Sequence, residues 1–294
     1  WFDRMGKNVG MAGEPDVNDL RAPELSPDGR HIAVDRTVQE NSDVWLMDLV
    51  RGGFTRLTFD AKADFIPLWS PDGTRIAFGA MRKGSCDIWI KPASGTGTEE
   101  LLLGTPKQEW PVDWSKNGRF LLYTQLDPID PKTMTDIWAL PMTGNDRKPL
   151  VVANTSFQEG QGQFSPDGRW VAYETNESGS GFEIVVQAFP EPNGKWQVSI
   201  DGGVQPRWRA DGKELYFIAP DRKLMAVSVA VLGSAFEAGK PVALFATRIF
   251  AGGGSGKPQY AVSRDGRFLI NQVLEESATT LITLILNWNP EQKK

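Results

Sequence analysis

A four-residue turn motif that recurs along the whole chain constrains the fold more than any other feature of the sequence. Each copy has Ser, Pro, Asp and Gly, or close variants of them, in the same order. The six copies occupy residues 26–29, 70–73, 115–118, 165–168, 209–212 and 263–266. Pro presets φ at the second position, Asp or Asn bonds to its own backbone, and Gly accepts positive φ. The motif therefore predicts six tight turns at equivalent places in a repeated unit.

The segments around each turn have the pattern of β-strands. A bulky apolar residue precedes each turn, namely Leu25, Trp69, Trp114, Phe164, Trp208 and Val262. An apolar strand follows the turn, a third strand begins with an acidic residue as in 43–45 and 87–89, and a more polar fourth strand follows, as in 54–58. Repeats of about 40 to 50 residues with four strands are typical of propeller blades. The sequence predicts an all-β fold: a six-bladed β-propeller of four-stranded antiparallel blades, in a single domain over 1–294.

The two ends of the chain decide how such a ring closes. After the sixth turn the chain offers a third strand over 280–288 but no fourth strand, and residues 1–12 precede the first blade. We expect segment 1–12 to complete the last blade, because an open ring would expose apolar blade faces. The alternative is a seventh blade whose first strands lie upstream of Trp1.

Composition excludes several classes of function. The net charge of −5 does not favour nucleic acid as a partner. No apolar run approaches the roughly 20 residues of a membrane span. A single cysteine, Cys86, excludes an internal disulfide, and a single histidine, His31, argues against zinc sites built on histidine and against a Ser-His-Asp triad. We therefore expect no catalytic residues, no metal and no cofactor in this chain.

One set of residues suggests a ligand site. Counting eight residues back from the Asp or Asn of each turn gives a carboxylate in three consecutive blades: Asp64, Glu109 and Glu159. Phe65 and Trp110 follow two of them. Acids beside aromatics at a channel mouth suit a cationic ligand, a peptide or a protein. These five residues are the predicted ligand-binding residues, and the alternatives are three solvated loop carboxylates or an acidic, calcium-like site of a propeller enzyme.

The repeated phrases resemble the TolB-like propeller repeats of bacteria, which are WD-repeat-like and are named for their Pro-Asp-Gly turns. Further phrases are similar to the C-terminal propellers of bacterial eukaryotic-type serine/threonine kinases: 1–4, 194–199, 205–208, 211–215 and 286–288. That resemblance implies a sensor or interaction domain outside the kinase domain. It implies an extracytoplasmic place, although composition alone leaves the compartment open.

Three functions are consistent with these observations. The first is a non-catalytic propeller that binds a protein, a peptide or a small ligand, as the sensor domain of a kinase. The second is the substrate-gating propeller of a prolyl oligopeptidase-type serine peptidase, and the third is a TolB-like periplasmic scaffold. What the gene encodes on either side of residues 1–294 would discriminate between them.

Overall fold

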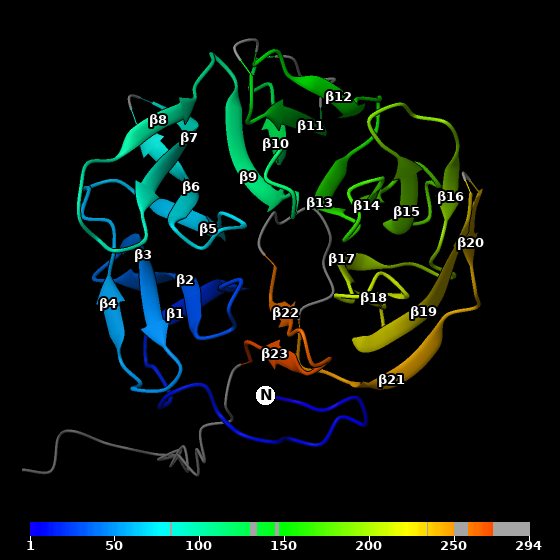
Figure 1. The fold of residues 1–294 in the computed structure, drawn as a ribbon, viewed down its shortest axis with the longest axis horizontal. Helices are drawn as coiled ribbons and strands as arrows, with labels where there is room; N and C mark the ends of the chain where they lie inside the picture. Colours follow the sequence, from blue (N-terminus) through cyan, green and yellow to red (C-terminus); the bar gives the residue numbers. More distant parts are fainter. Residues whose placement is uncertain (83, 130–133, 145–146, 234, 250–257, 273–294) are drawn as a thin grey trace, which may run out of the picture.

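The described part of the chain consists of strands and loops, without helices, arranged around a central axis (Figure 1). The structure is a computed structural model. It describes residues 1–82, 84–129, 134–144, 147–233, 235–249 and 258–272. Among these residues no helix is long and apolar enough to cross a membrane.

Five antiparallel sheets form the blades, and each begins with its innermost strand. Blade 1 consists of β1 (Asp19–Leu25), β2 (His31–Val38), β3 (Asn41–Asp48) and β4 (Phe54–Arg56). Blade 2 consists of β5 (Asp64–Trp69), β6 (Arg75–Arg82), β7 (Ser85–Pro92) and β8 (Glu100–Leu103). Blade 3 consists of β9 (Gln108–Trp114), β10 (Phe120–Leu126), β11 (Thr135–Pro141) and β12 (Leu150–Ala153).

The remaining strands follow the same order around the ring. Blade 4 consists of β13 (Glu159–Phe164), β14 (Trp170–Thr175), β15 (Glu183–Ala188) and β16 (Lys195–Gln197). Blade 5 consists of β17 (Val204–Trp208), β18 (Glu214–Ile218) and β19 (Lys223–Leu232), and both β20 (Ala235–Ala238) and β21 (Val242–Ala246) pair with β19. The sixth repeat forms a two-stranded sheet of β22 (Tyr260–Val262) and β23 (Phe268–Ile270).

The recurring turns join the first and second strands, as the sequence predicts. In blade 2, the hydroxyl of Ser70 donates to Asp72 Oδ1 at 2.6 Å and accepts from the backbone N–H of Arg75 at 2.9 Å. Gly73 closes the turn at a φ of +71°, where a side chain would be strained. The Pro27 ring of the preceding turn lies 3.7 Å from the position that a Cβ on Gly73 would take. Adjacent turns therefore pack against one another and form one face of the disc, which we call the turn face.

The hydrophobic core is divided among the interfaces between blades. Between blades 1 and 2, for example, Trp69 and Phe78 pack against Ala33 and Val44, and all four side chains are buried. A fully buried Phe contributes about 1.5–3 kcal/mol through the hydrophobic effect. No blade could bury these faces alone, so the stability of the fold depends on the neighbours on both sides.

The two-stranded sheet fills the position between blade 5 and blade 1. Tyr260 and Phe268 pack against Tyr216 of blade 5. On the other side, Leu269 packs against Ile32 of blade 1. Apolar contacts therefore continue around the whole ring.

The structure thus corrects the predicted number of blades, because it shows five blades rather than six or seven. The sixth repeat has only its first two strands among the described residues, with three residues in each. The third strand expected over 280–288 lies outside the described residues.

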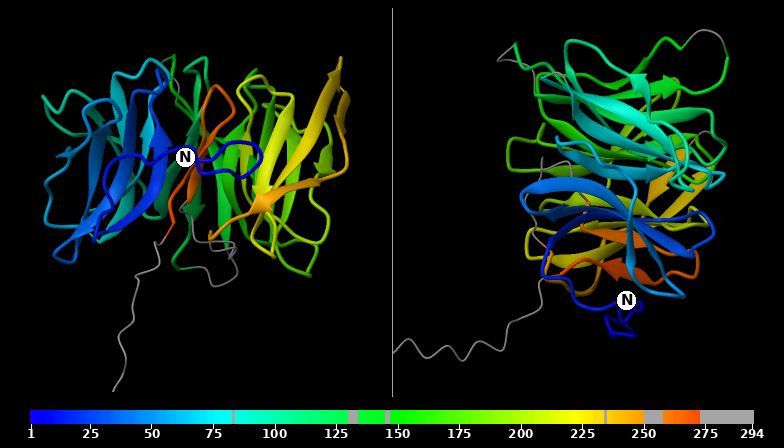
Figure 2. Two further views of the ribbon diagram at one scale, coloured as in Figure 1. Left: turned by 90° about the horizontal axis from the view of Figure 1, so that it is seen from below. Right: turned by 90° about the vertical axis from the view of Figure 1, so that its left-hand side faces the viewer.

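The N-terminal segment runs along this two-stranded sheet (Figure 2). The backbone N–H of Phe2 donates to the carbonyl of Phe268 at 2.8 Å, and the N–H of Phe268 donates to the carbonyl of Phe2 at 2.9 Å. The Phe2 ring stacks on Phe245 with 5.9 Å between the centroids. Arg4 forms a bidentate ion pair with Glu214 at 2.7 and 2.6 Å. Phe2 therefore takes the edge of β23 that a third strand would use.

Candidate functional site

Every innermost strand except the short β22 has an irregular register, and this irregularity directs side chains toward the channel. The pairing register with the second strand shifts in β1, β5, β9, β13 and β17. In four of these strands a residue that is not glycine has a positive φ at the same place: Ala22, Ile66, Gln161 and Gln205. A bulge of this kind re-aims the residues that follow it. Positive φ in non-glycine residues is uncommon, and strain of this type is concentrated at functional sites.

One residue per repeat lines the channel, and in the first five repeats it lies just after this irregularity. It directly precedes the bulky residue before the turn: Glu24, Leu68, Asp113, Gln163, Arg207 and Ala261. We call these six residues the channel positions. Three of them are charged, so the centre of the disc is polar on the turn face.

Hydrogen bonds between blades hold the backbone of these positions in place. Trp69 Nε1 donates to the carbonyl of Glu24 at 3.3 Å, and Trp208 Nε1 donates to the carbonyl of Gln163 at 3.2 Å. The tryptophan of one blade thus fixes the channel position of the preceding blade. Trp69 and Trp208 therefore orient part of the site as well as filling the core.

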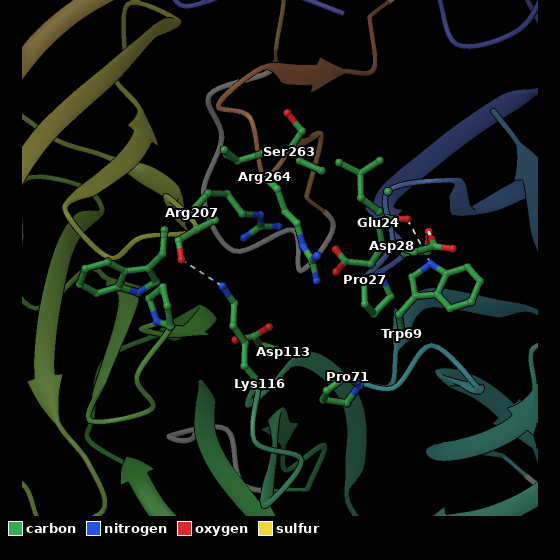
Figure 3. A pocket seen from close by; sticks show the side chains of 18 of the residues that line it. Glu24, Pro27, Asp28, Trp69, Pro71, Asp113, Lys116, Arg207, Ser263 and Arg264 are labelled. Atoms are coloured by element: carbon green, nitrogen blue, oxygen red, sulfur yellow. Dashed lines mark hydrogen bonds between the residues drawn. The ribbon is translucent and has the colours of Figure 1, made fainter. Parts of the chain in front are cut away.

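The channel positions surround a cavity of about 680 Å³ that opens on the turn face (Figure 3). Four cationic residues line it: Arg207 from blade 5, Lys116 from blade 3, and Arg264 and Arg267 at the sixth turn, where Arg267 pairs with Asp265. Arg207 is only 6% exposed. Its Nη1 donates to the carbonyl of Pro206 at 2.8 Å, and its guanidinium lies 5.8 Å from the centre of the Tyr260 ring.

Lys116 spans the channel, because its Nζ donates to the carbonyl of Ala210 at 3.4 Å. Partial burial lowers the pKa of Lys116, since desolvation penalises the charged form. Arg264 is exposed at the rim.

Four acidic residues also line the cavity: Asp28 and Asp265 belong to the turns, and Glu24 and Asp113 are channel positions. Asp113 Oδ2 accepts a hydrogen bond from the backbone N–H of Phe164 at 2.7 Å, which ties blade 3 to blade 4. Burial raises the pKa of Asp113 to about 6, against the opposing effects of this hydrogen bond and of Arg207. Burial also raises the pKa of Glu24 to about 7; the charge of Arg207 opposes this shift and that of Asp113 adds to it. Glu24 and Asp113 are therefore less fully ionised near neutral pH than exposed carboxyls would be.

The structure places the carboxylates predicted from the sequence elsewhere. Asp64, Glu109 and Glu159 lie at or next to the start of their inner strands, at the end opposite the turns, and each is 0% exposed. Asp64 pairs with Arg82 at 3.0 Å. Glu109 accepts a hydrogen bond from Gln125 Nε2 at 3.4 Å and, like Glu159, accepts another from a threonine four residues earlier.

The two predicted aromatics are brought together between blades 2 and 3. A Cβ added to Gly79 would lie 3.0 Å from the Phe65 ring and 3.2 Å from Trp110 Cβ. None of the five predicted residues lines the turn-face cavity. The three carboxylates are not the solvated loop groups of the first alternative, and ligand binding by the five residues stays a prediction.

The channel positions were not among the residues predicted from the sequence, although they too lie at a fixed distance from each turn. Counting four residues back from the turn Asp or Asn, instead of eight, gives all six of them. Alternation along a strand predicts which side chains share a face, but it does not predict the bulge that re-aims them.

The described residues show no catalytic centre. No group of three or more His, Cys, Asp or Glu side chains in them could hold a metal ion. The ring of His31 lies 6.2 Å from that of Trp69, beside the first turn. Cys86 is buried, and its thiol donates to the carbonyl of Glu109 at 3.1 Å. Burial raises the pKa of this thiol to about 12.

The chain is a β-propeller: five blades surround a central channel that is polar on the turn face. Residues 17–188 match the TolB beta propeller domain, and the chain belongs to this family. The match covers more than half of the chain.

The individual relatives are similar to only part of this chain, and their sequence identity to it is low. Over 191 residues the chain is 26% identical to the uncharacterized peptidase YuxL of Bacillus subtilis (strain 168), which covers 52% of this chain and 29% of that protein. Over 82 residues it is 33% identical to the Tol-Pal system protein TolB of Anaeromyxobacter dehalogenans (strain 2CP-C), covering 28% of this chain and 19% of that protein. The chain thus spans less than a third of the length of these curated relatives.

A solved structure shares the fold over most of both chains. A protein from Agrobacterium tumefaciens assigned as TolB superposes with a TM-score of 0.67 at 18% identity, covering 87% of this chain and 90% of that chain. A puromycin-hydrolyzing peptidase of Mycobacterium tuberculosis superposes with a TM-score of 0.61 at 16% identity, covering 88% and 44%. These likenesses show the fold, and the resemblance to kinase-associated propellers is not shown by them.

Proposed function

We propose that this chain is a non-catalytic, protein-binding propeller of the TolB-like scaffold type. The family supports the proposal, because a relative with the same kind of propeller repeat is the Tol-Pal system protein TolB. The described residues support it through their chemistry: one half-buried histidine, one buried cysteine and no cluster of metal ligands.

The observation that carries the proposal is a group of exposed apolar side chains on the face opposite the turns, which we call the loop face. They lie in the loops that lead into the inner strands and at the hairpins between second and third strands: Val17, Phe59, Met81, Ile129, Met134, Phe157 and Ile200. Phe59 is 64% exposed and Ile200 is 61% exposed. Aromatic and Met side chains are enriched in protein interfaces, so this face suits a partner protein.

The residues predicted from the sequence lie beneath this same face. Asp64 and Phe65 begin the inner strand of blade 2, and Glu109 and Trp110 begin that of blade 3. We propose that a basic or peptide group of the partner approaches them between the loops, with Glu159 as the third acid. Desolvation raises the pKa of Asp64 to about 7, so a cation that entered would favour the ionised form.

A matched pair of variants tests the proposal. The first replaces loop-face residues, Phe59→Ser, Phe157→Ser and Ile200→Ser. The second replaces equally exposed apolar residues of the outer strands, Leu101→Ser, Val151→Ser and Val242→Ser.

Proteins retained from a bacterial periplasmic extract by the immobilised chain are identified by mass spectrometry, purified and measured by calorimetry. We expect the loop-face variant to weaken the Kd at least tenfold and the outer-strand variant less than twofold. The proposal fails if no purified protein binds the wild-type chain, or if both variants have the same effect.

The second candidate function is a substrate-gating propeller of a serine peptidase. The match to YuxL over 52% of this chain favours it. In that case the gene would encode a hydrolase domain next to this propeller, whereas a kinase domain there would restore the sensor interpretation. Sequencing the flanking coding region decides between the three contexts.

We also propose that residues 1–294 are one domain whose segment 1–12 completes the last blade. The two hydrogen bonds between Phe2 and Phe268 and the Arg4–Glu214 ion pair support this.

A further inference from the structure

The turn-face cavity has the features of a built ligand site, and it lies at the opposite end of the channel from the loop face. Its volume of about 680 Å³ lies within the range of small-molecule sites, about 300–1,000 Å³. It is ringed by side chains from every repeat, and the Trp69 and Trp208 hydrogen bonds between blades fix two of their backbone positions.

Arg207 is the residue that most clearly points to a ligand. A charged side chain that is 94% buried is costly unless its N–H groups are paired. Among the described residues, however, the guanidinium has one hydrogen-bond acceptor, the carbonyl of Pro206. The remaining N–H groups line the cavity (Figure 3). An arginine held in this way presents a planar fork that matches a carboxylate.

The cavity is lined by both signs of charge, with Arg267 and Asp265 paired at the sixth turn and Asp28 at the first turn, and this mixture favours a ligand with one negative charge over a dianion. Lys116 and Arg264 add two cations near Arg207, and Figure 3 shows the three side chains extending toward a common space. Glu24 and Asp113 face the same space and would repel a dianion such as phosphate more than a carboxylate. Asp113 also has one oxygen already engaged by the N–H of Phe164.

We propose that the turn-face cavity binds a carboxylate, held by the Arg207 guanidinium with Lys116 and Arg264 around it. The carboxylate belongs either to a small organic acid or to the C-terminus of a peptide, and both present the same group to the arginine. The Leu68 and Ala261 sides of the cavity would contact the apolar part of such a ligand. This site is separate from the protein-binding loop face, so the two proposals can fail independently.

The test uses the whole chain and defined probes: sodium butyrate, which is a monoanion, inorganic phosphate, and one hexapeptide in free-acid and amidated forms, all at equal ionic strength. Binding is followed by titration calorimetry and by tryptophan fluorescence, because Trp69, Trp114 and Trp208 line the cavity. We expect binding of butyrate or of the free-acid peptide, at least tenfold weaker binding of phosphate, and no binding of the amidated peptide.

Substitutions assign the binding to the site. Arg207→Gln should weaken carboxylate binding at least tenfold, because it removes a charge-assisted pair. Arg209→Gln is the matched control, since Arg209 lies two residues away, outside the cavity, and pairs with Glu214. If Arg207→Gln does not fold, the exposed Arg264→Gln should still weaken binding several-fold.

Each outcome of these titrations either identifies the source of the carboxylate or overturns the proposal. Butyrate binding identifies a small acid as the ligand source, and binding of the free-acid peptide alone identifies a peptide terminus. The proposal is overturned if no carboxylate binds, if phosphate binds as tightly, or if Arg209→Gln weakens binding as much as the cavity variants do.

Discussion

The contact of the N-terminal segment with the two-stranded sheet allows a quantitative prediction. In the double variant Phe2→Ala with Arg4→Ala, the stacking of Phe2 on Phe245 and the ion pair with Glu214 are lost. Truncating a half-buried Phe costs about 2 kcal/mol, less than the 3–5 of a fully buried one. A half-exposed ion pair adds about 0.5 kcal/mol.

The expected change in melting temperature follows from the size of the chain. Unfolding entropy is about 2.1 cal/mol/K per residue, or roughly 0.6 kcal/mol/K for 294 residues. A loss of about 2.5 kcal/mol therefore lowers the Tm by about 4 °C. Scanning calorimetry measures this shift, and amide hydrogen exchange should show faster exchange in residues 258–272.

Met5→Ser is the control, because Met5 lies in the same segment and is 83% exposed. It should leave the Tm within 1 °C of the wild-type value. A double variant that melts like the control, with unchanged exchange in 258–272, would refute the role of segment 1–12 in completing the ring.

Three further predictions concern buried groups. Burial raises the pKa of Asp136 to about 6, so the folded state binds more protons than the unfolded state between about pH 4 and 6. The free energy of unfolding should therefore rise as the pH falls through this window. Denaturant titrations of Asp136→Asn should show a smaller rise. Because burial raises the pKa of Cys86 to about 12, the thiol should not react with a thiol reagent at pH 8 until the chain unfolds, and rapid labelling of the native protein would contradict its burial. Gly203→Ala should destabilise the fold by about 1–3 kcal/mol in urea titrations, because the new Cβ would lie 2.8 Å from the Phe217 ring; an unchanged midpoint would show that the ring moves freely.

Much of the fold was predictable because its repeated turns require particular residue types. A turn that needs Pro for φ, Asp for a backbone bond and Gly for positive φ is readable from sequence alone, and the strands on both sides of it follow. The predicted turns and their strands agree with the described blades. The number of blades was predicted incorrectly, because counting turns assumes that every turn belongs to a complete sheet. The turn at 263–266 belongs to a sheet with two described strands.

The candidate site was less predictable. A register count finds residues that are equivalent in each repeat, but it does not tell which end of the strand is covered by neighbouring loops. Asp64 and Glu109 are equivalent, and both are buried beneath the loop face. Arg207 and Asp113 are equivalent too, and they line one cavity because the inner strands of blades 5 and 3, on either side of blade 4, both face the channel. Such long-range convergence has no local signal in sequence.

The inter-blade bond from a tryptophan to a channel carbonyl has a consequence for how such a protein can diversify. The bond engages the backbone of the channel residue and leaves its side chain unconstrained. An acid and an amide occupy the two positions held in this way, Glu24 and Gln163. Exchanging them would alter what the pore accepts while the scaffold stays intact, so propellers of one architecture can acquire different ligands through a few substitutions.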